Sequence, residues 1–343
     1  MQRDTEQLGL FDYQNRLEEL SSRPNALDRL NQVVHWEQFR PLLTKLLIGK
    51  EAAPTGRPRF DVVLMFKLLV LQRTYGLSDE QAELQVLDRF SFQRFLGMTV
   101  ADDVPKRTTI WDYREHLRLS GGEPALWKAF ERLLAKQGVK LTTGKIIDAS
   151  FVDVPRQHNS KDDNADISDG TMPEGWDKKS TSFLSQKDRD ARWALKNDEE
   201  HFGYKNHVKV DRKTKLIEAH VVSSANVGDQ DAVEHLVAKT DGTLWADKGY
   251  GGKRVGDLLA KLSIRDRRQV QARHCHPLTI RQMRTNQKRA RIRARVEHVF
   301  GAMKHMKADY IRCVGFARAQ FTIGLNNLVY NLHRLAWLRC AHG

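Results

Sequence analysis

The sequence predicts an α/β protein in which a helical N-terminal domain (residues 1–140) precedes a second domain (residues 141–343) built on a mixed sheet flanked by helices. Three observations predict this class. Up to about residue 140 the apolar residues recur at helical spacing, and from Gly144 short β-type runs alternate with helical segments. The chain has 343 residues, 40% of them apolar, which is enough for two cores.

The N-terminal helices are predicted from their caps and stops. Residues 61–75 place apolar side chains at helical spacing, with Asp61 as the cap and Gly76 as the stop. Ser78 opens the next helix, and a further helix opens at Thr108. Helices joined by short turns are typical of helix-turn-helix DNA readers, but a helical dimerisation module has the same pattern. Both interpretations stay open.

The order of elements after Gly144 predicts the mixed sheet. Two β-type runs flank a polar turn, as in a hairpin, and strands and helices follow in alternation. A polar stretch at about residues 156–200 predicts a long exposed loop. The predicted elements in order are strand 145–154, strands 207–210 and 216–222, a helix from near Asp229, strand 243–247, a helix, a weak strand near Ile264 and a long basic helix.

The charge balance indicates a polyanionic partner. The chain carries 57 Lys plus Arg against 43 Asp plus Glu, a formal net charge of +14, and excess positive charge favours nucleic acid. Within the stretch 281–318 only Glu297 and Asp309 oppose the cations. The cations of this stretch are Arg281, Arg284, Lys288, Arg289, Arg291, Arg293, Arg295, Lys304, Lys307, Arg312 and Arg318.

Several other classes of protein are disfavoured. The sequence has no apolar run of the length a membrane span needs, and Met1–Gln7 leads into no secretory signal. Three cysteines form no paired framework, which fits a reducing cytoplasm. The run at 274–276 (HCH) suggests zinc at first sight, but three consecutive donors do not easily close a tetrahedral site.

Three carboxylates are the candidate catalytic residues. Asp148 and Asp247 stand at or near the ends of predicted strands, where sheet proteins bind ligands. Glu297 stands on the predicted basic helix and shares one face with Arg293 and Lys304. Beside that face runs an apolar stripe that would press the helix onto the sheet. The stripe consists of Ile292, Val296, Val299 and Met303.

Converging carboxylates would need cations between them. Oxygen ligands select Mg²⁺ or Mn²⁺, and two such ions about 4 Å apart clamp the attacking and leaving oxygens of a phosphodiester displacement. Taken singly, each acid has an ordinary alternative: an Asp at a strand end caps a turn, and Glu297 pairs with Arg293 along one helix.

Other residues are assigned structural roles. Asp211 heads a turn, and Asp153 falls on the opposite strand face from Asp148. The apolar run between Ile323 and Leu335 has helical spacing and predicts core packing. Its polar members are expected on the other faces of that helix. They are Asn326, Asn327, Asn331 and His333.

Three segments together resemble the catalytic motifs of bacterial DDE transposases, most closely the insertion-sequence 5 family. They are residues 146–150 (IIDAS), 245–250 (WADKGY) and 293–304 (RARVEHVFGAMK). The family's C-terminal signature is Tyr, two residues, Arg, three residues, Glu, six residues, then Lys or Arg. Arg293, Glu297 and Lys304 keep this spacing, whereas Ala290 stands where the Tyr is expected, so the supporting role of that Tyr is in doubt.

The resemblance extends over nearly the whole chain. The N-terminal segments 56–60, 68–73, 77–81 and 107–110 resemble the helical domain of the same family, and the segments 190–193, 203–207 and 324–332 are also similar to it. Each motif alone is moderately specific, and together, in order, they indicate the family.

The resemblance implies a ribonuclease-H-like catalytic fold whose metal ligands are Asp148, Asp247 and Glu297, with two Mg²⁺ ions that Mn²⁺ can replace. It implies that water attacks a phosphodiester at a transposon end and that the freed 3′-OH then attacks target DNA. The 50 residues from Asp247 to Glu297 leave no room for a large insertion domain. Lys205 and His207 are expected to approach the site as supporting residues.

The resemblance also implies partners and a location. The partners are double-stranded DNA, both the terminal inverted repeats and the target, and a second copy of the chain, on the nucleoid in the bacterial cytoplasm. The expected DNA contacts are Arg107, Arg289, Arg293, Arg295 and Lys304. Two alternatives remain: a catalytically silent sequence-specific DNA-binding protein, and a two-metal nuclease that cuts without joining.

Overall fold

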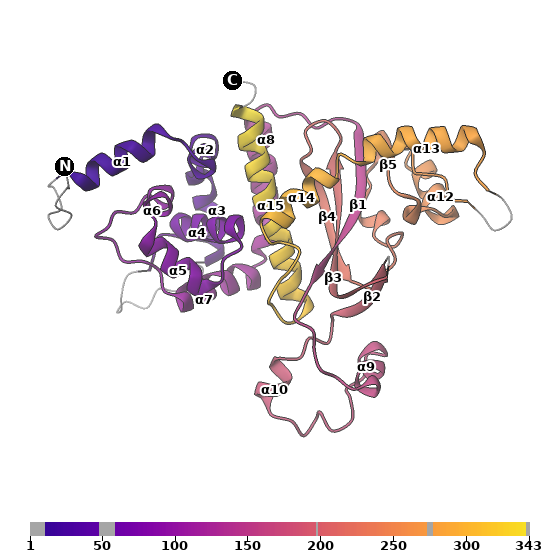
Figure 1. Cartoon of the computed structure of the whole chain (residues 1–343), viewed down its shortest axis with the longest axis horizontal. Helices are drawn as coiled ribbons and strands as arrows, with labels where there is room; N and C mark the ends of the chain where they lie inside the picture. Colours follow the sequence, from indigo (N-terminus) through magenta and orange to yellow (C-terminus); the bar gives the residue numbers. More distant parts are fainter. Residues whose placement is uncertain (1–10, 48–58, 197, 273–276, 341–343) are drawn as a thin grey trace, which may run out of the picture. The chain divides into compact units, whose positions relative to one another are not determined.

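The computed structural model describes residues 11–47, 59–196, 198–272 and 277–340, which form two compact units (Figure 1). Unit 1 consists of Met1–Ala129 with Leu332–Gly343, and unit 2 consists of Phe130–Asn331. The sequence predicts a boundary at residue 140 with the C-terminus in the second domain, whereas the contacts assign the last residues to unit 1. Independent folding of two domains stays a prediction. The segment at 274–276 and residues 56–58 of an N-terminal motif lie outside the described residues.

Unit 1 is helical, as predicted. The helix predicted for residues 61–75 is α4, Val62–Tyr75, with Asp61 as its N-cap and Gly76 as a left-handed C-cap at φ 60°. Its neighbours include α7, which starts at Arg107, one residue before the predicted start at Thr108. The elements are α1 (Asp12–Ser22), α2 (Ala26–Val33), η1 (Trp36–Phe39), α3 (Arg40–Leu47), α4, α5 (Asp79–Asp88), α6 (Phe90–Leu96), α7 (Arg107–Leu119) and α8 (Gly122–Lys136), which continues into unit 2.

The α4 helix forms the core of unit 1 because it is apolar nearly all round. Its residues from Met65 to Gln72 are all buried. Phe66 on this helix meets the ring of Trp36 edge-on, with centroids 6.0 Å apart. The N-terminus of α5 carries the predicted cap, in which Ser78 and Gln81 form a capping box.

Unit 2 contains one mixed sheet in the order β2-β3-β1-β5-β6, with β4 also paired to β3. The strands are β1 (Gly144–Asp153), β2 (Arg192–Lys196), β3 (Glu199–Asp211), β4 (Ile217–Ser224), β5 (Thr243–Trp245) and β6 (Arg265–Asp266). β1 runs antiparallel to β3 and parallel to β5. The predicted hairpin is β3 and β4, and the weak strand near Ile264 is β6.

The polar stretch at 156–200 is a wrong prediction in part, because it is not one loop. It contains α9 (Lys161–Ser168), α10 (Thr181–Ser185) and β2, and β3 begins at Glu199. Short capped helices account for the difference, since Ser160 forms a capping box with Asp163 and Ser180 caps α10. The stretch returns to the sheet at the buried carboxylate of Asp188, which accepts the Tyr204 hydroxyl at 2.8 Å.

The predicted long basic helix is two helices, α13 (Ile280–Arg293) and α14 (Glu297–His305). Between them the backbone hydrogen bonds shorten to three-residue steps, including Val296 N–H to the Arg293 carbonyl at 2.9 Å. This tighter turn redirects α14 so that Val296 and Val299 are fully buried. The remaining helical elements are α11 (Val233–Leu236), η2 (Lys239–Asp241), η3 (Lys248–Tyr250), α12 (Lys253–Lys261) and α15 (Phe316–Cys340).

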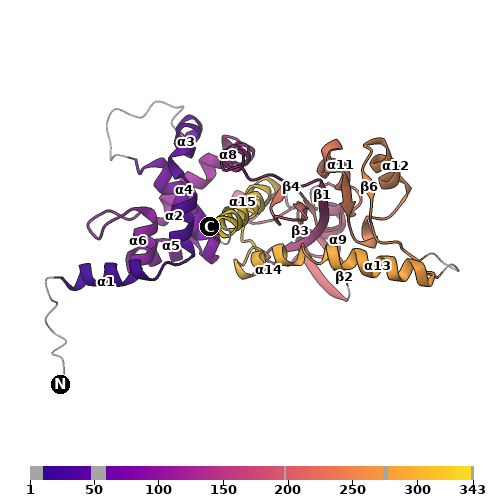
Figure 2. The same cartoon turned by 90° about the horizontal axis from the view of Figure 1, so that it is seen from above.

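Helices cover both faces of the sheet, seen from above in Figure 2. On one face Ile147 joins a buried cluster with α11 and α12, which includes Val233, Leu259 and Tyr250. On the other face Val152 packs with residues of β3 and α15 in a second cluster. Because side chains alternate along a strand, neighbouring residues of β1 belong to different faces.

The sequence predicts the polar residues of α15 on the faces beside its apolar run, and the structure buries those faces as well. Asn326, Asn327 and Asn331 are all buried. Asn327 exchanges two amide hydrogen bonds with Asn206 on β3, at 2.8 and 3.0 Å, and Asn331 bonds the backbone N–H and carbonyl of Ile217. These side chains satisfy polar groups of the sheet where the helix packs on it, so their burial carries little penalty.

Among the described residues no helix combines the length and the apolar character that a membrane crossing requires.

Candidate active site

Asp148 lies in the middle of β1 and not at its end, which corrects the prediction. It pairs with Val208 of β3 on one side. On the other side the parallel pairing with β5 stops at Ile146 and Trp245. Asp148 is therefore two residues beyond the last pair, where the neighbouring strand has ended and the edge of β1 is no longer covered by it. This placement gives the openness that a strand end would have given.

Asp247 occupies the matching position on the neighbouring chain segment, two residues beyond Trp245. It leaves the strand to become the N-cap of η3, where its Oδ1 accepts the N–H of Lys248 at 2.7 Å. Neighbouring strands lie about 4.8 Å apart, so the last pair, Ile146 and Trp245, starts the two acids at equal offsets from adjacent strands. The register of β1 and β5 is what associates the two acids.

Glu297 is the first residue of α14, with 64% of its side chain exposed. Its Oε1 lies 3.5 Å from Nη2 of Arg293, and Nη1 of the same guanidinium donates to Oδ2 of Asp148 at 2.6 Å. Arg293 thus joins a carboxylate from the sheet to one from α14. The apolar stripe is confirmed in part: Val296, Val299 and Met303 are buried, whereas Ile292 belongs to α13 and is only partly buried.

The carboxylate of Asp148 is largely withdrawn from water. Its side chain is 15% exposed. Burial raises the pKa of Asp148 above its ordinary value, and this effect outweighs the lowering by Arg293 and by the N–H of Ala149. A buried acid whose charge is incompletely compensated is a favourable place for a further cation.

The donor chemistry of the triad fits a hard divalent cation, because all three side chains offer carboxylate oxygen and none offers sulfur. The geometry is less complete. Within the described residues, no three His, Cys, Asp or Glu side chains are gathered closely enough to hold a metal ion. Asp247 uses one oxygen as a cap and Glu297 points into solvent, so sharing an ion requires these side chains to rotate.

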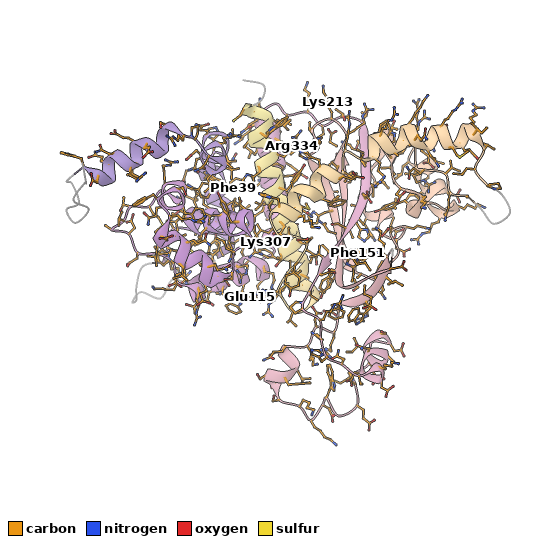
Figure 3. The ribbon with its side chains drawn as sticks, in the orientation of Figure 1. Phe39, Glu115, Phe151, Lys213, Lys307 and Arg334 are labelled. Carbon is orange, nitrogen blue, oxygen red and sulfur yellow. The ribbon has the colours of Figure 1, made fainter. Side chains whose placement is uncertain are left out.

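Lys205 and His207 lie on the face of the sheet opposite to Asp148. In the register of β1 and β3, Lys205 pairs with Phe151 and His207 with Ala149, both one strand position out of phase with Asp148. The Lys205 ammonium lies over the Phe151 ring at 5.3 Å, and Phe151 is labelled in Figure 3. Neither residue supports the site by contact with Asp148.

Sequence reasoning missed two residues near the acids, Asp229 and Tyr250. Tyr250 is 1% exposed, and among the described residues its hydroxyl has no hydrogen-bond partner. Burial, and then the charges of Asp229, Asp148 and Asp247, raise the pKa of Tyr250 well above its ordinary value. The sequence predicts a helix start near Asp229, whereas the structure begins α11 at Val233. The available signal was that Asp229 follows β4 as Asp247 follows β5.

The expected DNA contacts on the basic helices differ in how exposed their side chains are and in how firmly the protein holds them. Arg289 is tied to the protein, since its Nη1 donates to the backbone carbonyl of Arg268, and burial lowers its pKa. Arg295 donates to the carbonyl of Arg212 at 3.0 Å but is exposed. Lys304 is exposed on α14. Of these three, Lys304 and Arg295 can meet a phosphate without leaving the core.

Arg107, the expected contact in the N-terminal part, opens α7 in unit 1. Its backbone N–H donates to Glu83 at 2.7 Å, and its side chain is exposed. Lys106 beside it forms an ion pair with the same carboxylate at 3.1 Å. The start of α7 is therefore held by the backbone N–H of Arg107 and by Lys106, both on Glu83. The guanidinium of Arg107 takes no part in these contacts and lies outside the core.

Acids on and just beyond neighbouring strands of a mixed sheet, next to basic helices, are typical of proteins that catalyse metal-assisted phosphoryl transfer. Comparison with known families specifies it. A family described as "Transposase DDE domain" matches residues 140–332, and one described as "Transposase domain (DUF772)" matches residues 15–116. The first match covers more than half of the chain, so the chain belongs to the transposase DDE domain family. It is a DNA transposase, in a family that depends on divalent metal. No solved structure matches the chain.

Proposed function

We propose that the chain cuts DNA at transposon ends and joins the freed 3′-OH to target DNA, with Asp148, Asp247 and Glu297 as the metal ligands. One arrangement supports the proposal: Arg293 bonds Asp148 and approaches Glu297, and Asp148 and Asp247 stand at equal offsets beyond the last β1–β5 pair. The proposed fold of unit 2 is ribonuclease-H-like, and the mixed sheet with helices on both faces is compatible with it.

Two Mg²⁺ ions, replaceable by Mn²⁺, would supply the activation of water or 3′-OH and the stabilisation of the leaving oxygen. The side chains would hold them from three elements, β1, the cap of η3 and the start of α14. Asp148 is rigidly placed because β1 is paired on the β3 side along its length. Asp247 and Glu297 belong to element starts and can turn toward it.

Arg293 would change partners during binding. Its guanidinium compensates Asp148 within the protein, and a scissile phosphate arriving between the acids offers it a second anion. Lys304 and Arg295 would hold the flanking phosphates, as backbone contacts position DNA without reading its sequence. The exposed Arg107 would contact DNA from unit 1, which is proposed as the module for end recognition or dimerisation.

The proposed partners are terminal inverted repeats and target DNA, bound by two copies of the chain because two ends must be brought together. The proposed location is the bacterial nucleoid. The basic charge of +14 supports the DNA partner.

Strand transfer with paired transposon ends and Mg²⁺ tests the function. Wild type should nick and join, whereas Asp148→Asn, Asp247→Asn and Glu297→Gln should each lose at least about 10³-fold in rate while still binding DNA. Normal joining by all three variants would remove the metal-site assignment. Nicking without joining by wild type would leave a nuclease, and binding without either reaction would leave a DNA-binding scaffold.

A further inference from the structure

The loop that follows β4 packs directly against the turn that Asp247 begins. A methyl group added at Gly249 would lie 3.6 Å from Oδ2 of Asp229, and one added at Gly252 would lie 3.0 Å from Oε1 of Gln230. The carboxylate of Asp229 therefore lies close to the η3 turn, at a residue two positions from Asp247.

The position of Asp229 is fixed from the sheet by Lys205. The Lys205 ammonium donates to Oδ1 of Asp229 at 3.0 Å and to the carbonyl of Val227 at 2.8 Å. The two side chains are only 13% and 26% exposed. One oxygen of Asp229 is thus held by Lys205, while the other oxygen faces the turn of Asp247.

A buried polar group lies among the same acids. The Tyr250 hydroxyl is within the electrostatic range of Asp229, Asp148 and Asp247, and it finds no hydrogen-bond partner among the described residues. A donor left unsatisfied in the interior is costly unless some ligand or water completes it. The acids around this hydroxyl indicate that the ligand site extends from Asp148 and Asp247 towards Asp229.

We propose that Asp229 is a fourth acid of the metal site, contributing negative charge beside Asp148 and Asp247, and that Lys205 limits this contribution by its ion pair with Asp229. The inference rests on the proposed function. It also gives Lys205 a role from the opposite face of the sheet, through Asp229 and not through Asp148.

The proposal predicts opposite changes in cation affinity for two single substitutions. Asp229→Asn removes the acid and leaves an uncompensated ammonium near the cation site, so cation binding should weaken. Lys205→Met leaves an uncompensated carboxylate at the same place, so cation binding should strengthen. A pair that acts only as a structural strut would weaken binding in both variants, because either change removes the contact that supports the η3 turn.

The test measures the affinity of the full chain for Mn²⁺, using the electron paramagnetic resonance signal of the free ion as the readout. We expect about 10-fold weaker binding for Asp229→Asn, about 3-fold tighter binding for Lys205→Met and near wild-type binding for the double variant. Asp229→Glu, which keeps the charge, should remain close to wild type. Asp231→Asn is the matched control, since this acid lies on the same loop but is 56% exposed and pairs with Arg254.

The outcomes separate the inference from the function on which it rests. If wild type binds Mn²⁺ and cuts DNA, but both single variants weaken binding or neither changes it, Asp229 is not a site acid and the inference falls alone. If wild type neither binds Mn²⁺ nor cuts, the proposed function falls with it. Circular dichroism of each variant checks folding, and a variant that unfolds is replaced by Asp229→Glu combined with Lys205→Arg, for which wild-type binding is expected and weakened binding would count against the proposal.

Discussion

Nη1 of Arg293, near the end of α13, lies 2.6 Å from Oδ2 of Asp148 on β1, although the two residues are 145 positions apart in the sequence. Both side chains are mostly buried, with 23% and 15% exposed. The pair compensates an acid whose pKa burial has already raised. It also ties the basic helices to the sheet at the point where the proposed chemistry takes place.

Breaking this pair from one side should destabilise unit 2. Arg293→Met leaves the Asp148 carboxylate without its cation, and we expect a loss of about 2 kcal/mol in the free energy of unfolding. Asp148→Asn combined with Arg293→Met removes the stranded charge and should recover part of that loss. Urea unfolding of the single and double variants provides the comparison, and equal stability of Arg293→Met and wild type would show that the pair contributes nothing.

Two cations of the basic helices should respond differently to substitution. Lys304→Ala removes an exposed charge, so DNA affinity should fall on all sequences and the slope of log affinity against log salt should drop by about 1. Arg289→Ala removes a side chain bonded to the Arg268 carbonyl, so its main effect should be on stability. Salt titrations of DNA binding distinguish them, and an equal loss of slope in both variants would contradict the difference.

The amide pair of Asn206 and Asn327 should show a strong coupling. Asn327→Leu leaves the buried amide of Asn206 without its partner, which should cost about 2 kcal/mol. The double change to Leu at both positions replaces two polar groups by apolar groups of similar size and should cost less than the single change. A double-mutant cycle by chemical denaturation measures the coupling, and additive losses would show that the two amides act independently.

His333 should make the stability depend on pH. Burial lowers its pKa to about 4, and one ring nitrogen lies 2.8 Å from the Thr74 hydroxyl. Because the folded pKa is below the unfolded value of about 6.5, the folded state binds fewer protons, so stability is complete above pH 6.5 and falls as pH drops towards 4. Between pH 7 and 5 wild type should lose about 2 kcal/mol more than His333→Gln. His207, whose pKa burial also lowers to about 4, is present in both proteins and cancels.

Local signals were predictable and long-range pairing was not. The cap at Asp61, the stop at Gly76 and the helix start at Ser78 depend on neighbouring residues, and all three are confirmed. The break between α13 and α14 was not foreseen, because the spacing of the apolar stripe is continuous across it. Val296, which stands at this break, is fully buried, and burial against distant parts of the chain is not visible in the local spacing.

For the site, the sequence indicated which acids to examine but not how they relate. The uncovered edge of β1 beside Asp148 depends on where β5 stops, and this pairing lies outside any local pattern. The same holds for Lys205 and His207, whose side of the sheet follows from the β1–β3 register. Asp229 was overlooked because its partner, Lys205, is on another strand. The metal-binding role of the triad stays a prediction.

The β1 register also limits how this sequence can change. Ile147 faces one core and Asp148 the other side, so deleting one residue between Gly144 and Ile147 would exchange their environments. The acid would then enter an apolar cluster, and Ala149 would take the position beside Arg293. We therefore expect β1 to tolerate substitutions better than insertions or deletions, because a shift in register disrupts the proposed site and the packing of the core together.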